Sequence, residues 1–290
     1  MNSLILIGDA RQRLAELPAG SARTCVTSPP YFGLRDYGVG GQIGLEDTPD
    51  AYVAEMVALF REVWRVLTDD GTLWLNLGDS FAKEKQLLGI PWRVAFALQA
   101  DGWYLRSDII WHKPNPMPES VTDRPTKSHE YLFLLTKSPR YYYDHEAIKE
   151  PVSDVSLARS KYAFHSDRPS TKNASMGGAG IHTDQMGERF VNPTGRNKRD
   201  VWTITTKPFK GAHFAVMPEA LVEPCVLAGS AEGDTVLDPF TGSGTVAVVA
   251  NRHGRNFVGT ELNAEYAQIA YDRITGDAPM LNIVSVTPSQ

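Results

Sequence analysis

The sequence predicts an α/β protein with a mainly parallel, doubly wound sheet and a polar insertion. Three observations support this fold class. Strand-like runs alternate with helical patterns over most of the 290 residues. Two strand-like runs, near opposite ends of the chain, lead into short motifs of turn-forming residues. A polar stretch, residues 151–200, interrupts the alternation between them.

The composition is that of an ordinary globular protein, with 42% hydrophobic and 22% charged residues. No apolar run approaches the ~20 residues needed to span a bilayer, and the N-terminus has no basic flank, so we expect neither a membrane span nor a signal peptide. The two cysteines, Cys25 and Cys225, lie in apolar settings, and the histidines show no metal-ligand spacing. We therefore expect no disulfide, no metal site and a cytoplasmic protein.

Residues 1–150 contain both helical and strand-like patterns. Thr48 and Pro49 suit a helix cap and a first helical position, and apolar side chains follow at helical spacing as far as Val66. Asp69-Asp70-Gly71 is expected to form a turn into the next strand. The strands expected here are Leu4–Ile7, Ala22–Thr27, Thr72–Leu77, Ser107–Trp111 and Tyr131–Thr136, and the other helices are Ala10–Leu17 and Pro91–Ala100.

Residues 201–290 return to the alternation after the insertion. The expected helices are Pro218–Ala228, Ser243–Arg252 and Ala264–Ile274, and the expected strands are Thr235–Leu237 and Asn256–Glu261. We therefore divide the chain into one half of the core at 1–150, an insertion at 151–200 and the other half of the core at 201–290.

The motif Asp238–Thr245 follows a strand and precedes a helix, which places a ligand at the helix N-terminus beyond the carboxyl end of the strand. Gly242 and Gly244 would let the backbone turn tightly and approach that ligand. Glu261 ends the next strand, where a carboxylate can accept both hydroxyl protons of a ribose. This element predicts a site for a cofactor that carries a nucleoside.

A nicotinamide cofactor is one alternative, because Gly242-x-Gly244-x-x-Ala247 satisfies the relaxed dinucleotide fingerprint. Asp238 counts against it, since a carboxylate at the end of the strand would repel a pyrophosphate. A carboxylate there suits a cofactor with a cationic amino group, such as S-adenosylmethionine. The motif also lies too close to the C-terminus for a second mononucleotide-binding half to follow it.

The other motif, Ser28-Pro29-Pro30-Tyr31, can act on an exocyclic amino group of a base. Such a nitrogen is a poor nucleophile because its lone pair is delocalised into the ring. The Ser28 hydroxyl and the Pro29 carbonyl can accept its two N–H groups, since Pro30 has no N–H and holds Pro29 extended. Tyr31 can stack on the base, which would have to be flipped out of a duplex.

The two motifs together resemble the beta group of amino-methylating DNA methyltransferases, in which the catalytic motif precedes the cofactor motif. Further segments share the likeness, which covers nearly the whole chain: Gly8-Asp9, Asn76–Ser80, Trp111–Pro114, Ser128–Tyr131 and His213–Leu221. The resemblance implies a Rossmann-like methyltransferase sheet that is circularly permuted, so that the C-terminal units around Asp238 and Glu261 lie beside the N-terminal strand.

The resemblance also implies the residues of the site. Ser28, Pro29, Pro30 and Tyr31 would handle the target base. S-adenosyl-L-methionine would be held by Asp9, Ala10, Asp238, Phe240, Thr241, Gly242, Ser243, Gly244, Thr245, Glu261 and Leu262. Relatives with serine at the position of Ser28 usually modify the N4 of cytosine, and those with aspartate the N6 of adenine.

The insertion 151–200 corresponds to the variable target-recognition region of that family. It carries eight Lys/Arg and five Asp/Glu residues, whereas the whole chain has a net charge of −5. A basic segment on an acidic body can bind phosphates locally. The residues expected to bind DNA are Arg189, Arg196, Lys198 and Arg199.

The resemblance implies a site-specific DNA methyltransferase of a bacterium or phage that acts on the N4 of cytosine, as part of a restriction-modification system or alone. An N6-adenine enzyme is the nearest alternative. A non-catalytic nucleic-acid-binding protein and an NAD-dependent oxidoreductase are more distant ones. A homodimer and a restriction endonuclease partner stay open at this point.

Overall fold

The computed structural model describes residues 1–152, 195–206, 216–277 and 282–288. Among them, nine strands form one sheet in the order β6-β4-β5-β3-β2-β7-β8-β1-β9. The strands are β1 (Asn2–Ile7), β2 (Ala22–Thr27), β3 (Leu67–Leu77), β4 (Tyr104–His112), β5 (His129–Thr136), β6 (Val201–Thr203), β7 (Thr235–Asp238), β8 (Asn256–Glu261) and β9 (Ile283–Thr287). The helices are α1 (Ala10–Ala15), α2 (Pro49–Val66), α3 (Ile90–Ala100), α5 (Glu219–Gly229), α6 (Thr245–Arg252) and α7 (Ala264–Asp277).

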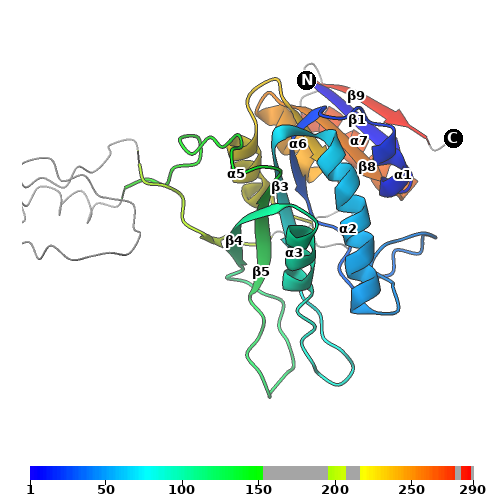
Figure 1. Cartoon of the computed structure of the whole chain (residues 1–290), viewed down its shortest axis with the longest axis vertical. Coiled ribbons are helices and arrows are strands. Elements are labelled where there is room, and N and C mark those ends of the chain that lie inside the picture. The colour runs from blue at the N-terminus through cyan, green and yellow to red at the C-terminus, as the bar shows by residue number, and fades with distance from the viewer. Residues whose placement is uncertain (153–194, 207–215, 278–281, 289–290) are drawn as a thin grey trace, which may run out of the picture. The chain divides into compact units, whose positions relative to one another are not determined.

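The helices form two layers, one on each face of the sheet (Figure 1). In one layer α2 packs against both α1 and α3, and in the other α6 packs against both α5 and α7. The fold is therefore the doubly wound α/β arrangement expected from the alternation of strands and helices.

The sheet is parallel except at β5, which runs antiparallel to both β3 and β4. The C-terminal strands β7 and β8 lie beside the N-terminal β1, with Asp238 paired to Gly259 and Leu4 paired to Val258. The structure thus confirms that the C-terminal units around Asp238 and Glu261 lie beside the N-terminal strand.

Local signals place most element ends correctly. Thr48 caps α2, because its hydroxyl accepts a hydrogen bond from the N–H of Ala51 at 3.1 Å, and Pro49 is the first helical residue. Trp202, on β6, is 5% exposed and lies 6.4 Å from the ring of Trp74. It anchors the strand that returns from the insertion.

Two expectations on the elements need correction. Asp69-Asp70-Gly71 does not form a turn before the strand, because β3 already begins at Leu67. The pairing of β3 with β2 shifts between Ala22 and Thr24, so the turn-forming residues lie in an irregular part of the strand. In addition, β9 pairs with β1 and was not expected from its sequence.

The chain forms two compact units, residues 1–147 with 199–290 and residues 148–198. All nine strands belong to the first unit. In the second, the described residues include an antiparallel bridge between Glu150 and Arg196. None of the helices that the structure describes is long and apolar enough to cross a membrane.

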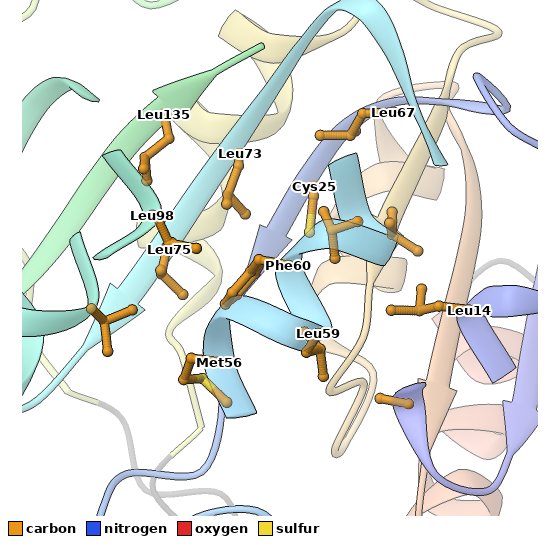
Figure 2. Packing of buried hydrophobic residues seen from close by; sticks show 14 of the residues in the cluster. Leu14, Cys25, Met56, Leu59, Phe60, Leu67, Leu73, Leu75, Leu98 and Leu135 are labelled. Atoms are coloured by element: carbon orange, nitrogen blue, oxygen red, sulfur yellow. The ribbon is translucent and has the colours of Figure 1, made fainter. Parts of the chain in front are cut away.

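The main core lies between the sheet and the layer of α1, α2 and α3 (Figure 2). Apolar residues of α2 point into it at helical spacing, and Met56, Leu59 and Phe60 are fully buried. They pack with side chains of β2 and β3, among them Cys25 and Leu73. This packing holds β2 and the loop after it against α2.

Replacing Phe60 with alanine should test the importance of this core. Because the ring is fully buried, we expect Phe60→Ala to lower the free energy of unfolding by about 3–5 kcal/mol. Phe96 in α3 is 55% exposed, so Phe96→Ala serves as the matched control and should have a much smaller effect. Chemical denaturation followed by circular dichroism measures both, and equal losses would contradict the assignment of the core.

Candidate active site

The two sequence motifs meet at the point where the strand order of the sheet reverses. From β2 the chain continues to β3 on one side, and from β7 it continues to β8 on the other. Parallel sheets bind ligands outside the carboxyl ends of their strands at such a point. Thr27 ends β2 and Asp238 ends β7, and the Thr27 hydroxyl donates a buried hydrogen bond of 2.7 Å to Asp238 Oδ1. Ser28 follows directly.

The loop after β2 presents acceptors at this crevice. Ser28 is half-buried and Pro29 is buried. Within the described residues, no group donates a hydrogen bond to the Pro29 carbonyl, as its expected role requires. The next carbonyl, of Pro30, accepts a hydrogen bond of 2.9 Å from the Tyr52 hydroxyl of α2. The loop is therefore anchored to the core while the Pro29 carbonyl stays available.

Tyr31 makes a contact that sequence reasoning missed. Its hydroxyl donates to Glu130 Oε2 at 2.7 Å and accepts from Asn76 Nδ2 at 2.7 Å. The Ser28 hydroxyl also donates to the Tyr31 hydroxyl oxygen, at 3.3 Å. Burial, and next the negative charge of Glu130, raise the pKa of the Tyr31 phenol well above its usual value. The phenol therefore keeps its proton at neutral pH.

Glu130 forms the inner end of this network. Its side chain is 16% exposed, and its Oε2 also accepts from Asn76 Nδ2 at 2.9 Å. Its other oxygen binds the ammonium group of Lys113, which lies 4.2 Å from the centre of the Trp111 ring. Asn76, Lys113 and Glu130 lie in segments that carried the family resemblance, but nothing in their local sequence indicated that they would meet.

They meet because β3, β4 and β5 are paired in register. Asn76 of β3 is opposite Leu132, and Trp111 of β4 is opposite Glu130. The Glu130 carboxylate faces Tyr31 and Lys113. The Asp79 carboxylate accepts from the backbone N–H groups of Ser80 and Ile90 at 2.9 and 3.0 Å. This matches a capping role at the start of α3.

The cofactor motif forms the expected strand, tight turn and helix. Gly242 and Gly244 both have left-handed φ angles, +51° and +80°, which favour glycine. A Cβ on Gly244 would lie 2.9 Å from Cβ of Ala270 in α7, so this glycine also permits close packing of α7 on the turn.

Asp238 is the buried charge of this element. It is 2% exposed, and its Oδ1 accepts from the Thr27 hydroxyl and from the backbone N–H of Phe240 at 3.0 Å. Among the described residues, no group donates to Oδ2. Burial raises the pKa of Asp238 to about 7, against the opposing effect of those two hydrogen bonds. A cationic ligand at Oδ2 would supply the partner that the carboxylate lacks.

Glu261 lies at the end of the neighbouring strand. Its carboxylate accepts from the backbone N–H groups of Gly242 at 2.8 Å and Asn263 at 2.9 Å. Burial raises its pKa, while these hydrogen bonds oppose the shift. The carboxylate is thus fixed between the glycine turn and the end of β8, and its position fits the expected contact with a ribose.

The end of β1 lies beside the end of β8. The N–H of Gly8 donates to the Glu261 carbonyl at 2.8 Å, which brings Asp9 and the buried Ala10 next to the cofactor strands. The Asp9 carboxylate caps α1 through the N–H of Arg11 at 2.8 Å and also pairs with the Arg11 guanidinium. Burial raises the pKa of Asp9, but the hydrogen bonds and charge of Arg11 outweigh burial, so the pKa is lowered overall.

The remaining expected cofactor residues line or support the turn. Phe240 packs against the main core, Thr241 is buried, and Leu262 is half-buried after β8. Ser243 and Thr245 have another partner, because the Arg273 guanidinium of α7 donates to both hydroxyls, at 2.9 and 3.1 Å. These two hydroxyls therefore help to fix the turn onto α7.

The expected DNA-binding residues lie away from these strand ends in the sequence. Arg189 falls outside the described residues. Arg196 binds Glu150 through its guanidinium, with Nε 3.1 Å from Oε2. Lys198 ends the second unit and Arg199 begins the continuation of the first. The segment 213–215, which resembled the start of a helix leading to the cofactor site, also lies outside the described residues.

Comparison with known proteins agrees with this geometry. The family model described as "DNA methylase" matches residues 22–272. The Type II methyltransferase M.Cfr9I of Citrobacter freundii is 47% identical in an alignment that covers 93% of this chain and 87% of that protein. TTHA0409 of Thermus thermophilus, solved in complex with S-adenosyl-L-methionine, superposes with a TM-score of 0.65 at 25% identity, covering 98% of this chain and 99% of that chain.

A third similar protein is the cytosine-N4-specific PvuII DNA methyltransferase. Its structure superposes with a TM-score of 0.69 at 19% identity, covering 97% of this chain and 93% of that chain. This likeness concerns the fold. It extends over the sheet and both helix layers of the present chain.

Gly78 offers a test of how tightly Tyr31 is held. A Cβ on Gly78 would lie 2.5 Å from Cε2 of the Tyr31 ring, which is held by three hydrogen bonds. We expect Gly78→Ala to displace the ring and to lower the free energy of unfolding by about 1–3 kcal/mol. Gly276→Ala in α7 meets nothing within 4 Å and should be neutral or slightly stabilising. Equal melting temperatures for the two variants would contradict this packing.

Proposed function

Because the chain belongs to the N6/N4 family of DNA methylases, we propose that it methylates the N4 amino group of a cytosine that is flipped out of DNA. As a member of this family, the protein is an S-adenosylmethionine-dependent DNA methyltransferase. The proposal concerns the target atom, the residues that handle each substrate and the partners. The observation that supports it best is the hydrogen bond between Thr27 and Asp238, which joins the two motifs at one crevice.

Asp238, the glycine turn and Glu261 form the proposed cofactor site. The buried Asp238 carboxylate has an oxygen without a hydrogen bond among the described residues and fits a cationic amino group. Gly242 and Gly244 let the backbone approach, and Glu261 is fixed where a ribose would lie. When bound, S-adenosylmethionine supplies an electrophilic methyl group on a sulfonium.

Ser28 and Pro29 form the proposed base site. The Ser28 hydroxyl and the Pro29 carbonyl would accept the two N–H groups of the target nitrogen, while Tyr31 supports the base. Most of the acceleration would come from alignment of the nitrogen with the methyl carbon and the sulfur. The adjacency of β2 and β7 supports that alignment, because their ends carry the two substrates side by side.

The cytosine assignment depends on Ser28. A neutral hydroxyl and a carbonyl can accept from the amino group of either base, so the chemistry itself permits adenine as well. The resemblance of serine-containing motifs to N4-cytosine enzymes favours cytosine. PvuII methyltransferase, whose fold the chain shares, is cytosine-N4-specific by name.

We propose that residues 151–200 recognise the DNA sequence, with Arg189, Arg196, Lys198 and Arg199 bound to phosphates. In this proposal residues 1–150 and 201–290 are the two halves of the catalytic core. A restriction endonuclease that cuts the same DNA sequence is the proposed functional partner, since M.Cfr9I and other relatives are Type II methyltransferases.

The product identifies the target atom. DNA treated with the wild-type enzyme should contain N4-methylcytosine after digestion to nucleosides and mass spectrometry. Ser28→Ala should slow methylation by about 10²–10³-fold, because it removes an acceptor used at the reacting nitrogen, and should leave cofactor binding intact. N6-methyladenine without N4-methylcytosine would refute the cytosine assignment. It would not contradict the proposed roles of Ser28 and Pro29, which can accept from the amino group of either base.

The raised pKa of Asp238 predicts how cofactor binding depends on pH. Because that pKa is about 7 in the free protein, the carboxylate is protonated at acidic pH and must lose its proton to bind a cation. The affinity for S-adenosylmethionine should therefore fall by up to about tenfold per pH unit as the pH drops from 7 to 5. Isothermal titration calorimetry over this range measures the dependence.

Asp238→Asn separates this effect from that of Glu261, whose pKa is also raised. This variant should bind the cofactor more weakly by about 1.5–3 kcal/mol at pH 7.5. Its affinity should also vary less with pH than that of the wild type. An identical pH dependence in the two proteins would exclude Asp238 as the titrating group.

A further inference from the structure

The network around Tyr31 has a defined direction. A carboxylate accepts hydrogen bonds and donates none, so the groups that face Glu130 must donate to it. The Tyr31 hydroxyl does so at 2.7 Å, and Asn76 Nδ2 does so at 2.9 Å. Lys113 neutralises the charge of the carboxylate from the other side. The single proton of Tyr31 is therefore committed to Glu130.

The hydrogen bond from Tyr31 to Glu130 also decides how the Ser28 hydroxyl is oriented. Because the Tyr31 hydroxyl donates its proton to Glu130, its oxygen can only accept, and the Ser28 hydroxyl donates to it at 3.3 Å. The single proton of Ser28 is then also committed. The lone pairs of Ser28 Oγ are left to accept, which is the role required toward an amino N–H group. Asn76 Nδ2 lies 3.3 Å from the same oxygen, farther than it lies from the Tyr31 hydroxyl or Glu130 Oε2.

The reaction requires an acceptor of a proton. Transfer breaks the bond between sulfur and the methyl carbon and forms the bond between that carbon and the amino nitrogen. The nitrogen becomes positively charged and must lose one proton. A chain of hydroxyls that ends at a carboxylate can carry it away, with each oxygen gaining one proton as it releases another.

We propose that Glu130 is the positioning residue that makes Ser28 an acceptor and that it takes up, through Ser28 and Tyr31, the proton released by the methylated nitrogen. This inference rests on the proposed role of Ser28 toward the amino group. The proton moves from nitrogen to Ser28 Oγ, the Ser28 proton to Tyr31, and the Tyr31 proton to Glu130. The neutral Glu130 then returns its proton to solvent before the next turnover.

The surroundings of Glu130 fit this role. The charged and titratable groups that face it are Tyr31, Lys113, Lys127 and His129. The Lys113 ammonium binds the carboxylate directly, whereas burial lowers the pKa values of Lys127 and His129. Among the described residues, no second carboxylate contacts Tyr31 or Ser28.

Two isosteric variants test the relay. Glu130→Gln keeps the shape of the side chain but removes the carboxylate, and Tyr31→Phe keeps the ring but removes the hydroxyl. At saturating S-adenosylmethionine, each should lower the single-turnover rate of methylation by about 10²-fold. Because both interrupt the same chain, the double variant should be no slower than the slower single variant. Cofactor affinity should stay within about twofold of the wild type.

The pH profile of the single-turnover rate adds a readout that a merely structural role would not change. At S-adenosylmethionine concentrations that saturate the protein at every pH, which removes the effect of Asp238 on binding, the wild-type rate should fall toward acidic pH, because a protonated Glu130 cannot accept a further proton. Glu130→Gln should lack this acidic limb and be uniformly slow. Glu62→Gln is the matched control, since Glu62 pairs with Arg65 within α2 and, among the described residues, contacts neither Tyr31 nor Glu130, and it should keep the wild-type rate and profile.

A third readout needs no turnover. Glu130 raises the pKa of the Tyr31 phenol, so Glu130→Gln should lower that pKa in the free protein. ¹³C-tyrosine NMR titration, with Tyr31→Phe to assign the signal, measures it. If Glu130→Gln does not fold because Lys113 loses its partner, Tyr31→Phe still decides, since it leaves the Glu130–Lys113 pair intact.

Near-wild-type rates in Tyr31→Phe or in a folded Glu130→Gln would overturn the relay, as would a double variant whose loss is the product of the single losses. Formation of N6-methyladenine by the wild type would refute only the cytosine assignment. The same variants would still test the relay in that case, because either base presents an amino group to Ser28.

Discussion

The buried hydrogen bond between Thr27 and Asp238 is the constraint on which the rest of the site depends. The two residues are 211 positions apart and end neighbouring parallel strands. Both are almost fully buried, so neither polar group has water as an alternative partner. The bond fixes the ends of β2 and β7 relative to each other. Ser28 and the Pro29 carbonyl on one strand thereby keep a set position relative to the turn that follows the other.

The carboxylates of Asp238 and Glu130 differ in whether the protein supplies a cationic partner, and this difference matches the proposed substrates. Among the described residues, Asp238 has no cation beside it, so burial raises its pKa. A cationic ligand would neutralise the charge of its ionised carboxylate. Glu130 is neutralised by Lys113 within the protein. An uncharged base can therefore approach Ser28 without meeting an uncompensated charge. The overall charge of −5 describes neither site, because the distribution of charges decides what binds.

Features that depend on neighbouring residues could be read from the sequence. The Thr48 cap with Pro49, the tight turn at Gly242 and Gly244 and the strand that ends at Thr27 follow from local backbone preferences, and the structure shows each of them. The family resemblance was likewise carried by two short motifs. Both the order of these motifs and the alternation of strands and helices lie within the sequence itself, which is why the fold class could be predicted.

Features that depend on pairing between distant segments were decided only by the tertiary structure. Asn76, Lys113 and Glu130 are brought to Tyr31 by the antiparallel register of β5 with β3 and β4, and no local pattern encodes that register. The pairing of β9 with β1 and the irregular start of β3 at Asp69–Gly71 were missed for the same reason. The sequence determined which groups the protein carries at the ends of its strands. The sheet decided which of them meet, because hydrogen bonds between strands, and not nearness in the chain, set their distances.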